Sequence, residues 1–474
     1  MIKKIVSFLL SLSVLLCIPA CGPSDTGSSA ESSKGATLPD YDKKSEELSV
    51  KIAGWVIPAN LDETQIGYLK ESGISVLQAA SAGSGTLSID VSTELSESNR
   101  TLMETLKQND FSVLLHIRGK DAERLEYVTN VTEYDAVQGL CFDEPDKSQI
   151  DAIASRVDSY NAKAGNKDLF VNLYPSLATA VKNDFGGSYK AYLEYFCEKV
   201  LSRLTAGEKW LSADRYPLTY DNKGEPCLDT GWLADVEAVA LVARQYEEVK
   251  TNFFIQTMPY GGEKNSGEVL GSRDRVPTYE DVRMQEYTLM TFGYDMISCF
   301  CYGSPVAGVE FLDRQVAMID REGNRTDIYY AVQKVNREIL AFDHVLKQFN
   351  WKGVFTNDAG VTTDGKERTK NSSFAGLTSR MSLAAIDSLA EVTTSADTLF
   401  GYFMDEEENV GFSVVNYNDS SAGLSDTVTL RFNPSYGFRN AICYVGGEKK
   451  TVSLNGNALE LELGVGEGVF VIPY

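Results

Sequence analysis

The stretch Gly139-Leu140-Cys141-Phe142-Asp143-Glu144-Pro145 is the point from which the rest of this chain is best interpreted. Its apolar residues end abruptly in two acids and a proline, which predicts a buried strand that stops where a loop begins. The proline biases Glu144 toward an extended backbone and away from helix. Helical spacing of Ile150, Ile153, Val157 and Tyr160 follows, so the two acids are expected at the carboxyl end of a strand that leads into a helix.

Length and charge limit the classes of protein to which the chain can belong. Its 474 residues predict two domains plus flexible ends, and 43% hydrophobic residues suffice for large cores. The formal net charge of -23 gives an acidic surface that repels nucleic acid and anionic lipid head groups. A neutral or cationic small molecule or a glycan is therefore the expected partner.

The N-terminus has the layout of a secretory signal, because Lys3 and Lys4 precede an apolar run over residues 5–18. The run ends in Ile18-Pro19-Ala20-Cys21-Gly22, which resembles the lipobox of bacterial lipoproteins. That resemblance implies a signal peptide over residues 1–21, a lipid on Cys21 and a location in the bacterial cell envelope outside the cytoplasm. An ordinary secreted protein is the alternative. Residues 22–47 are rich in Ser, Gly, Asp and Lys and are expected to form a flexible tether.

Strand and helix patterns alternate over residues 48–349. The expected strands are 50–59, 74–81, 111–118, 137–143, 169–174, 210–216, 253–258 and 296–302. Eight strand–helix units over about 300 residues predict an α/β fold, a closed (β/α)8 TIM barrel. A doubly wound open sheet is the alternative, but no Gly-x-Gly-x-x-Gly motif follows the first strand.

Two helices of this region are clear, and the pattern then changes. Apolar spacing predicts helices over residues 61–71, closed by Gly73, and over residues 328–346. After Trp351 only short strands with intervening turn residues remain, at 398–404, 410–416, 427–432, 441–445, 459–463 and 468–472. This spacing predicts a C-terminal β-sandwich domain over residues 350–474.

The carboxyl ends of the predicted barrel strands collect acids, amides and aromatic rings, because functional side chains of such barrels lie just past these ends. The positions are Trp55, His116, Arg118, Asp143, Glu144, Asn172, Tyr174, Asp214, Arg215, Tyr216, Gln256, Tyr260, Tyr302 and Ser304. Amides and carboxylates bind sugar hydroxyls, and two carboxylates are what cleavage of a glycosidic bond requires. The chain has two histidines and no Cys-x-x-Cys motif, which disfavours zinc, and no phosphate-binding loop or Gly-x-Ser-x-Gly elbow.

Several of these stretches, in their order along the chain, resemble clan A glycoside hydrolases, in particular the β-galactosidase-like barrels with a trailing β domain. The matching stretches are Phe142-Asp143-Glu144-Pro145, Asn172-Leu173-Tyr174-Pro175, Asp214-Arg215-Tyr216-Pro217, Arg275-Val276-Pro277-Thr278 with Arg283 and Gln285, and residues 293–302. The resemblance implies that Glu144 is the proton donor, with Asp143 in place of the clan's preceding Asn. The clan's nucleophile, a Glu at the end of strand seven, is replaced by Gln256.

Asp214, at the end of strand six, is therefore the candidate second catalytic carboxylate, and a salt bridge to Arg118 or Arg283 is the alternative role. Glu144 is expected to have a raised pKa, and Asp214, followed by Arg215, to stay ionised. The candidate substrate-binding residues are Trp55, Asp143, Asn172, Tyr174, Arg215, Tyr216, Gln256 and Tyr302. Simple packing or structural roles are the alternatives for Trp55, Tyr302, Asn172 and Tyr174.

The sequence as a whole predicts a surface-anchored glycoside hydrolase that cleaves a neutral glycan with carboxylate chemistry. It predicts no cofactor, no metal and no nucleic-acid partner, and contact with a membrane only through the N-terminal lipid. The alternative is a catalytically inactive barrel, a lipoprotein that binds glycan without cleaving it. Gln256 favours this alternative, whereas Asp143, Glu144 and Asp214 favour the enzyme.

Overall fold

A computed structural model describes residues 38–43, 48–80, 85–117, 122–221, 223–260, 275–306, 311–312, 315–359 and 373–474. Residues 38–474 form one compact unit. The expected signal peptide, Cys21 and most of the tether lie outside the described residues. Within them, no helix has both the length and the apolar character that crossing a bilayer would require.

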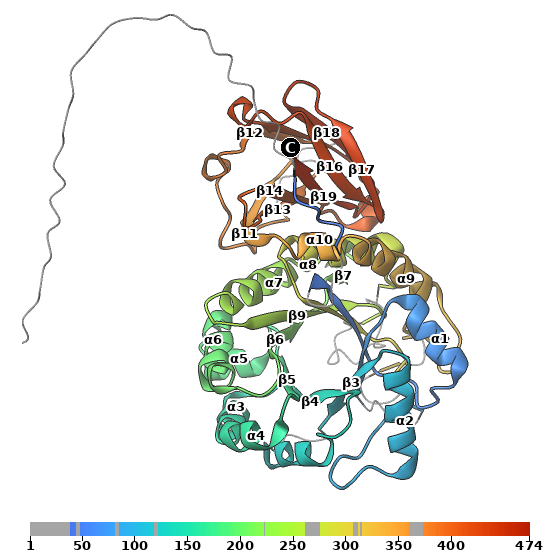
Figure 1. The fold of residues 1–474 in the computed structure, drawn as a ribbon. Coiled ribbons are helices and arrows are strands. Elements are labelled where there is room, and N and C mark those ends of the chain that lie inside the picture. The colour runs from blue at the N-terminus through green and yellow to red at the C-terminus, as the bar shows by residue number, and fades with distance from the viewer. Residues whose placement is uncertain are drawn as a thin grey trace, which may run out of the picture. The chain divides into compact units, whose positions relative to one another are not determined.

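Eight parallel strands close into a barrel, in the order β1-β10-β9-β6-β5-β4-β3-β2, and helices surround it (Figure 1). The barrel strands are β1 (Lys51–Trp55), β2 (Val76–Ala79), β3 (Ser112–His116), β4 (Val137–Asp143), β5 (Asp168–Leu173), β6 (Lys209–Asp214), β9 (Val249–Gln256) and β10 (Met296–Phe300). A short hairpin of β7 (Leu218–Tyr220) and β8 (Pro226–Leu228) follows β6. The predicted (β/α)8 barrel is thus confirmed, with all eight predicted strands in place.

The helices lie between the strands along the chain. They are α1 (Glu63–Ser72), α2 (Glu97–Gln108), the 3-10 helix η2 (Ala122–Asn130), α3 (Lys147–Ala154), α4 (Val157–Ala164), α5 (Thr179–Asp184), α6 (Tyr189–Lys199), η3 (Leu201–Arg203), α7 (Thr230–Ala243), α8 (Tyr279–Thr291), α9 (Asp327–Leu340) and α10 (Asp343–Leu346). Helix α1 ends as predicted, at a left-handed Gly73 whose N–H donates to the Lys70 carbonyl. The prediction of a single helix over residues 328–346 is wrong. The helix is interrupted between α9, which ends at Leu340, and α10, which begins at Asp343, although the apolar spacing of the sequence continues across the interruption.

Side chains that point into the barrel form layers along its axis. The lowest layer is apolar and consists of Ala53, Val76, Leu114, Cys141, Phe170, Trp210 and Met296. Because side chains alternate along a strand, the residues two positions further on form the next layer. That layer is polar and includes Gln78, Asn172, Ser212 and Ser298, joined by Asn252 of β9. Asp143 and Asp214 come two positions after Cys141 and Ser212, at the carboxyl ends of β4 and β6.

Antiparallel sheets follow the barrel, as predicted. A six-stranded sheet has the order β11-β13-β14-β19-β16-β17, and a three-stranded sheet has the order β12-β15-β18. The strands are β11 (Asn350–Asn357), β12 (Leu389–Thr394), β13 (Thr398–Met404), β14 (Val410–Asn416), β15 (Asp426–Phe432), β16 (Asn440–Val445), β17 (Glu448–Ser453), β18 (Ala458–Leu463) and β19 (Gly468–Pro473), with short 3-10 turns η4 (Leu383–Ala385), η5 (Ser420–Ala422) and η6 (Pro434–Tyr436). Strand β11 begins at Asn350, where the sequence predicts the domain boundary, and that boundary stays a prediction.

The C-terminal sheets pack against the barrel helices through buried polar contacts. Arg275, which precedes α8, forms ion pairs with Asp281 of the same helix and with Asp419 of the C-terminal region, the second at 2.5 Å. The segment 38–43, here called the strap, contacts the same region: the Tyr41 hydroxyl donates to Asp405 Oδ2 at 2.6 Å, and Lys449 forms an ion pair with Asp42. Asp405 is itself buried.

Candidate active site

The candidate site lies at the carboxyl ends of the barrel strands, where β4, β5 and β6 run side by side. Asp143 is in register with Asn172, and Asn172 is in register with Ser212, two positions before Asp214. The Asn172 amide nitrogen donates to Asp143 Oδ1 at 3.2 Å. Asn172 also contributes its backbone carbonyl, which accepts from the Glu144 N–H at 2.8 Å. The structure thus brings Asp143, Glu144, Asn172 and Asp214 together around one strand end.

Asp214 is the most perturbed acid of this group. Its Oδ2 accepts from the Tyr216 hydroxyl at 3.1 Å, and its Oδ1 is buried without a hydrogen-bond partner among the described residues. Burial, reinforced by the charge of Asp143, raises the pKa of Asp214 to about 7, against the opposing effect of Tyr216 and the Asn172 amide. A carboxyl group with a pKa near neutrality can hold a proton and release it under working conditions.

The prediction that Arg215 keeps Asp214 ionised is wrong. The guanidinium points away from its neighbour: Nε binds Asp229 at 2.7 Å, and Nη1 binds Ser176 at 2.7 Å and Asp235 at 3.3 Å. Successive side chains of a strand end point to opposite faces, so adjacency in sequence did not produce a contact. Arg283, the other described candidate for an ion pair with Asp214, binds Glu467 and the Val465 carbonyl instead. Arg118 lies outside the described residues.

Glu144 has a left-handed backbone, with φ of 47°, and not the extended one that Pro145 predicts. A non-glycine residue in this region is uncommon and strained, and such strain concentrates at functional sites. Because β4 ends at Asp143, Glu144 lies outside the regular alternation of side chains along that strand. Burial raises the pKa of the Tyr192 hydroxyl, and the nearby charges of Glu144 and Asp214 add to the rise. Tyr192 donates to the Pro145 carbonyl at 2.7 Å and so fixes the turn that carries Glu144.

Gln256 ends β9, the seventh strand of the barrel, as predicted. It is fully buried, and its side-chain oxygen accepts from the Leu218 N–H at 3.0 Å. Its side-chain nitrogen donates to the carbonyls of Met258 and Tyr260, each at 3.3 Å. The amide therefore holds the loops that follow β6 and β9 in this conformation, which is a structural role.

Aromatic rings line one side of the strand ends. Tyr216 stacks on Phe300, with ring centroids 4.7 Å apart, and Tyr260 packs edge-on against both rings. Trp55 packs edge-on against His116 and Phe254, each at 5.6 Å. Trp55, Tyr216, Tyr260 and Phe300 are half-buried and so retain exposed ring surface. Tyr302 differs, because it is fully buried in the main core and cannot stack on a sugar in this conformation; the packing alternative describes it.

Tyr174 contributes its backbone to the site. Its N–H donates to the Tyr192 hydroxyl at 3.2 Å, and its side chain is half-buried. Since Tyr192 also lies near Glu144 and Asp214, Tyr174 borders the group of acids. Its sugar-binding role stays a prediction.

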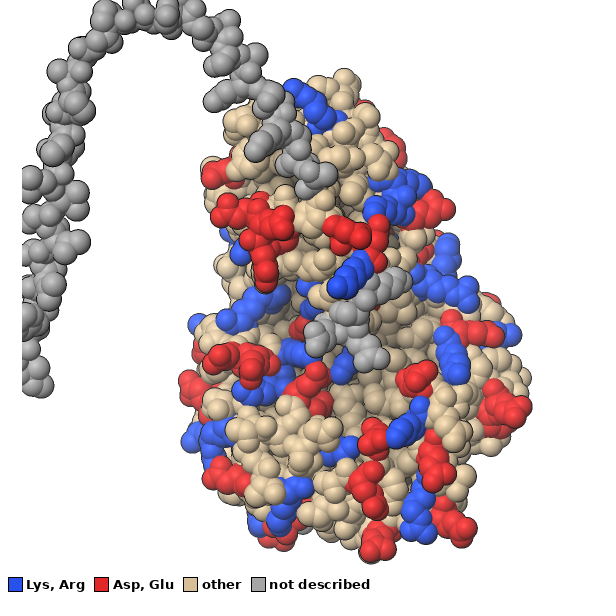
Figure 2. All heavy atoms as spheres, in the orientation of Figure 1, with Lys and Arg blue, Asp and Glu red and all other residues tan. Residues whose placement is uncertain are grey.

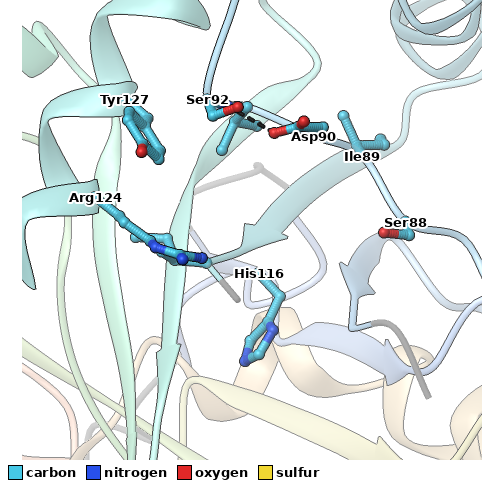
Figure 3. Close-up of a pocket in the computed structure, with 9 residues that line it drawn as sticks. Ser88, Ile89, Asp90, Ser92, His116, Arg124 and Tyr127 are labelled. Carbon is cyan, nitrogen blue, oxygen red and sulfur yellow. Dashed lines mark hydrogen bonds between the residues drawn. The ribbon is translucent and has the colours of Figure 1, made fainter. Parts of the chain in front are cut away.

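A pocket of about 400 Å³ lies beside this region (Figure 3). His116 at the end of β3 lines it, together with Arg124 and Tyr127 of η2 and the loop over residues 88–92. Figure 3 shows Arg124 between Tyr127 and His116, with Asp90 and Ser92 on the facing loop. Sequence reasoning identified only His116 here, because η2 and the loop carry no motif and come together only in the folded chain.

Metal binding and charge give further information on the site. Among the described residues, no group of three or more His, Cys, Asp or Glu side chains is arranged to hold a metal ion. On the face shown in Figure 2, acidic and basic side chains are interspersed, so this face presents no continuous basic surface to a polyanion. The described cysteines are not joined in disulfides, and all but Cys227 are buried.

Comparison with known proteins gives likenesses of fold alone. No protein-family model and no curated protein matches the sequence. Among solved structures, a family 39 glycoside hydrolase from the gut symbiont Bacteroides cellulosilyticus WH2 is similar with a TM-score of 0.46 and 8% identity, over 90% of this chain and 82% of that one. An alpha-amylase from Geobacillus thermoleovorans has a TM-score of 0.49 and 9% identity, over 91% and 99% of the two chains. A GH27 β-L-arabinopyranosidase from Geobacillus stearothermophilus has a TM-score of 0.44 and 10% identity, over 90% and 95%. These likenesses assign no activity, so the case for function depends on this chain's own residues.

Proposed function

We propose that this protein is a glycoside hydrolase whose carboxyl groups at the ends of β4 and β6 cleave a neutral glycan. One observation carries the proposal: Asp214, whose Oδ1 is buried, lies close enough to Asp143 to respond to its charge, and the pKa of Asp214 is raised to about 7. Two acids whose surroundings separate their protonation states are the arrangement that acid–base catalysis of glycosidic cleavage needs. The half-buried rings of Trp55 and Tyr216 supply apolar surface of the kind that packs against a sugar face.

The proposed roles differ from those expected from the sequence in one respect. Asp214 is the group that carries a proton near neutral pH, so it serves as an acid. Glu144, held at the mouth of the barrel by its strained turn, remains the second candidate proton donor. Asp143 is the neighbouring carboxylate that supports positive charge at the sugar carbon or activates water.

The test is a panel of aryl glycosides and of plant and host glycans, applied to the wild type, Glu144→Gln and Asp214→Asn. Each variant keeps its shape and loses a titratable proton, so turnover of an unactivated substrate should fall by roughly 10²–10⁴. An activated aryl glycoside needs less acid assistance and should be affected less. Glu248→Gln is the matched control for Glu144, because Glu248 also has a left-handed backbone, with φ of 59°, and precedes β9 at the opposite end of its strand. Wild-type turnover in Glu144→Gln would show that Glu144 is not the acid.

The second candidate function is glycan capture without cleavage. The observation that favours it is Gln256, whose amide is occupied by backbone groups at the strand end where the resembled clan has its nucleophile. A wild-type protein that binds a glycan of the panel, and releases no sugar from any of them, would establish capture and refute the hydrolase.

We also propose that the chain is a lipoprotein of the cell envelope, anchored through Cys21. The order of Lys3, Lys4, the apolar run and Ala20-Cys21 supports this. Mass spectrometry of the native N-terminus should find a lipid on Cys21, and an unmodified mature chain that begins elsewhere would refute the anchor. Assignment to the β-galactosidase-like group rests on the order of the sequence motifs and is likewise part of the proposal.

A further inference from the structure

A row of hydrogen-bonded side chains crosses the barrel interior and ends at Asp143. We call it the polar row; its members are Gln78, Ser298, Asn252, Ser212 and Asn172. The bonds run from Gln78 Nε2 to Ser298 Oγ at 3.3 Å, from Ser298 Oγ to Asn252 Oδ1 at 2.9 Å, from Asn252 Nδ2 to Ser212 Oγ at 2.8 Å, from Ser212 Oγ to Asn172 Oδ1 at 3.0 Å and from Asn172 Nδ2 to Asp143 Oδ1 at 3.2 Å. Asn172 is 4% exposed and the other four members are 0% exposed.

The row has a single direction. Gln78 begins the row as a donor, and its Oε1 is buried without a hydrogen-bond partner among the described residues. Each later member accepts a hydrogen bond from the residue before it and donates one to the residue after it, so every dipole points the same way. Rotating the side-chain amide of Asn252 or Asn172 by 180° would place a donor against a donor or an acceptor against an acceptor. The row therefore fixes the orientation of both amides. An ionised carboxylate accepts hydrogen bonds and donates none, so Asp143 is the end that this direction requires. Aligned bonds in a dry interior also strengthen one another.

The composition of the row argues against a purely structural purpose. Bulky branched residues dominate the interior layers of such barrels, and five polar side chains replace them here. Even a fully satisfied buried network is at best about neutral for stability in comparison with apolar packing, and this one leaves Gln78 Oε1 without a partner among the described residues. Its position directly beneath the candidate site accounts for its presence better than stability does.

We propose that the polar row is a positioning network that holds the Asn172 N–H toward Asp143 and thereby keeps Asp143 as the ionised carboxylate facing the proton on Asp214. Ser212, Asn252 and Ser298 are then positioning residues that never touch the substrate. The inference rests on the proposed function, because it assigns roles within the same site. The ionisable groups that interact with Asp143 include Asp214 and the thiol of Cys141.

The decisive variants are Ser212→Ala, one bond from Asn172, and Ser298→Ala, which interrupts the row further from Asp143. Carboxyl-carbon NMR of labelled aspartates, assigned with Asp143→Asn and Asp214→Asn, follows the titration of the pair without any substrate. Losing support for the charged form of Asp143 should raise the lower titration midpoint of the pair by roughly 0.3–1 pH unit. Ser298→Thr, which keeps the hydroxyl, should retain the wild-type midpoints.

Ser413→Ala is the matched control, because the Ser413 hydroxyl is equally covered and bonds to Thr291 at 2.6 Å, outside the row. It should move neither midpoint. An unchanged lower midpoint in Ser212→Ala would overturn the proposal, and so would an equal shift in Ser413→Ala. A shift in a protein that cleaves no glycan would sustain the positioning role and refute the hydrolase. Cleavage by a protein whose midpoints do not respond to Ser212→Ala would do the reverse.

Discussion

Each end of the barrel holds an aspartate whose pKa is raised by burial, and the two aspartates differ in the hydrogen bonds that they accept. Asp168 begins β5 at the amino end, and its Oδ1 accepts from the Glu208 N–H at 2.8 Å. Its Oδ2 accepts from Gln138 Nε2 at 2.8 Å and from Trp210 Nε1 at 3.0 Å. Asp214 ends β6 at the carboxyl end; among the described residues, Tyr216 donates to its Oδ2 and its Oδ1 has no hydrogen-bond partner.

The difference shows that burial alone does not make an acid reactive. Burial raises the pKa of both aspartates. At Asp168, hydrogen bonds from Gln138, Glu208 and Trp210 oppose the rise and hold the carboxylate as part of the structure. At Asp214 the charge of Asp143 adds to the rise. The Tyr216 hydroxyl and the Asn172 amide oppose it, but among the described residues only the Tyr216 hydroxyl lies in hydrogen-bond geometry with Asp214. The supply of donors thus separates a structural acid from one that can exchange a proton.

The largest expected effect is on catalysis. Asp214→Asn should lower turnover of the cleaved glycan by roughly 10²–10⁴ while the protein stays folded, because the amide keeps the shape and cannot carry the proton. Asp168→Asn, the same substitution at the other end of the barrel, should leave turnover within about threefold once folded protein is counted. Steady-state kinetics on both variants checks this, and equal losses would abolish the contrast.

For stability, substitution of Asp168 should have a larger effect than substitution of Asp214, which is the reverse of the order expected for catalysis. Asp168→Ala leaves Gln138, Trp210 and the Glu208 N–H without their acceptor, so the free energy of unfolding should fall by about 2–3 kcal/mol. Asp214→Ala removes an acid that is poorly supplied with donors, and should lower it by less than about 1 kcal/mol at pH 8. Chemical denaturation of both variants measures the two losses of unfolding free energy. A larger loss in Asp214→Ala than in Asp168→Ala would contradict the proposed difference between the two acids.

The pH dependence of stability follows from the raised pKa of Asp214, which moves from an ordinary 3.8 to about 7 on folding. The folded state holds this proton more tightly, so the stabilisation is complete below pH 3.8 and is lost as pH rises through about 7. Relative to the wild type, Asp214→Asn should therefore gain on the order of 2–3 kcal/mol in unfolding free energy between pH 5 and pH 8. Denaturation curves at the two pH values measure the gain, and no relative change would mean an ordinary pKa.

The smallest effect concerns the strained turn. Glu144→Gly relieves a left-handed backbone and should raise the unfolding free energy by about 0.5–1 kcal/mol while turnover is lost. Glu248→Gly relieves the same conformation and should give a similar gain with turnover intact. Thermal melting and kinetics of the pair separate strain that serves the site from strain that does not. A destabilised Glu144→Gly would mean that the Glu144 side chain makes contacts worth more than the strain.

Periodicity in the sequence was enough to locate the barrel. Apolar runs marked all eight of its strands, and β4, β13 and β14 have the predicted bounds. Polar β17, at the edge of its sheet, has no such run and was missed. The helix predicted after Pro145 is two helices, α3 and α4, because apolar residues keep their spacing across the break.

The position of the candidate site could be predicted from the sequence, but the directions of its side chains could not. The rule that function lies past strand ends correctly grouped Asp143, Asn172 and Asp214. It says nothing about where a side chain points, so Arg215 was paired with the wrong acid. The polar row escaped sequence analysis for a related reason: its members come from five strands, and each looks like an isolated polar residue until the barrel closes.

The strap also determines how the protein would carry mechanical load. A pull on the chain at residue 38 reaches Tyr41 and Asp42 first, and these are fastened to Asp405 and Lys449. Gln348 adds a further attachment, since its side chain donates to the Tyr41 carbonyl at 2.9 Å. Tension from the N-terminal side would thus be shared with the C-terminal sheets before it reached β1. The contacts of the strap would therefore bear a pulling force on the N-terminal side before that force could change the positions of the acids at the barrel mouth.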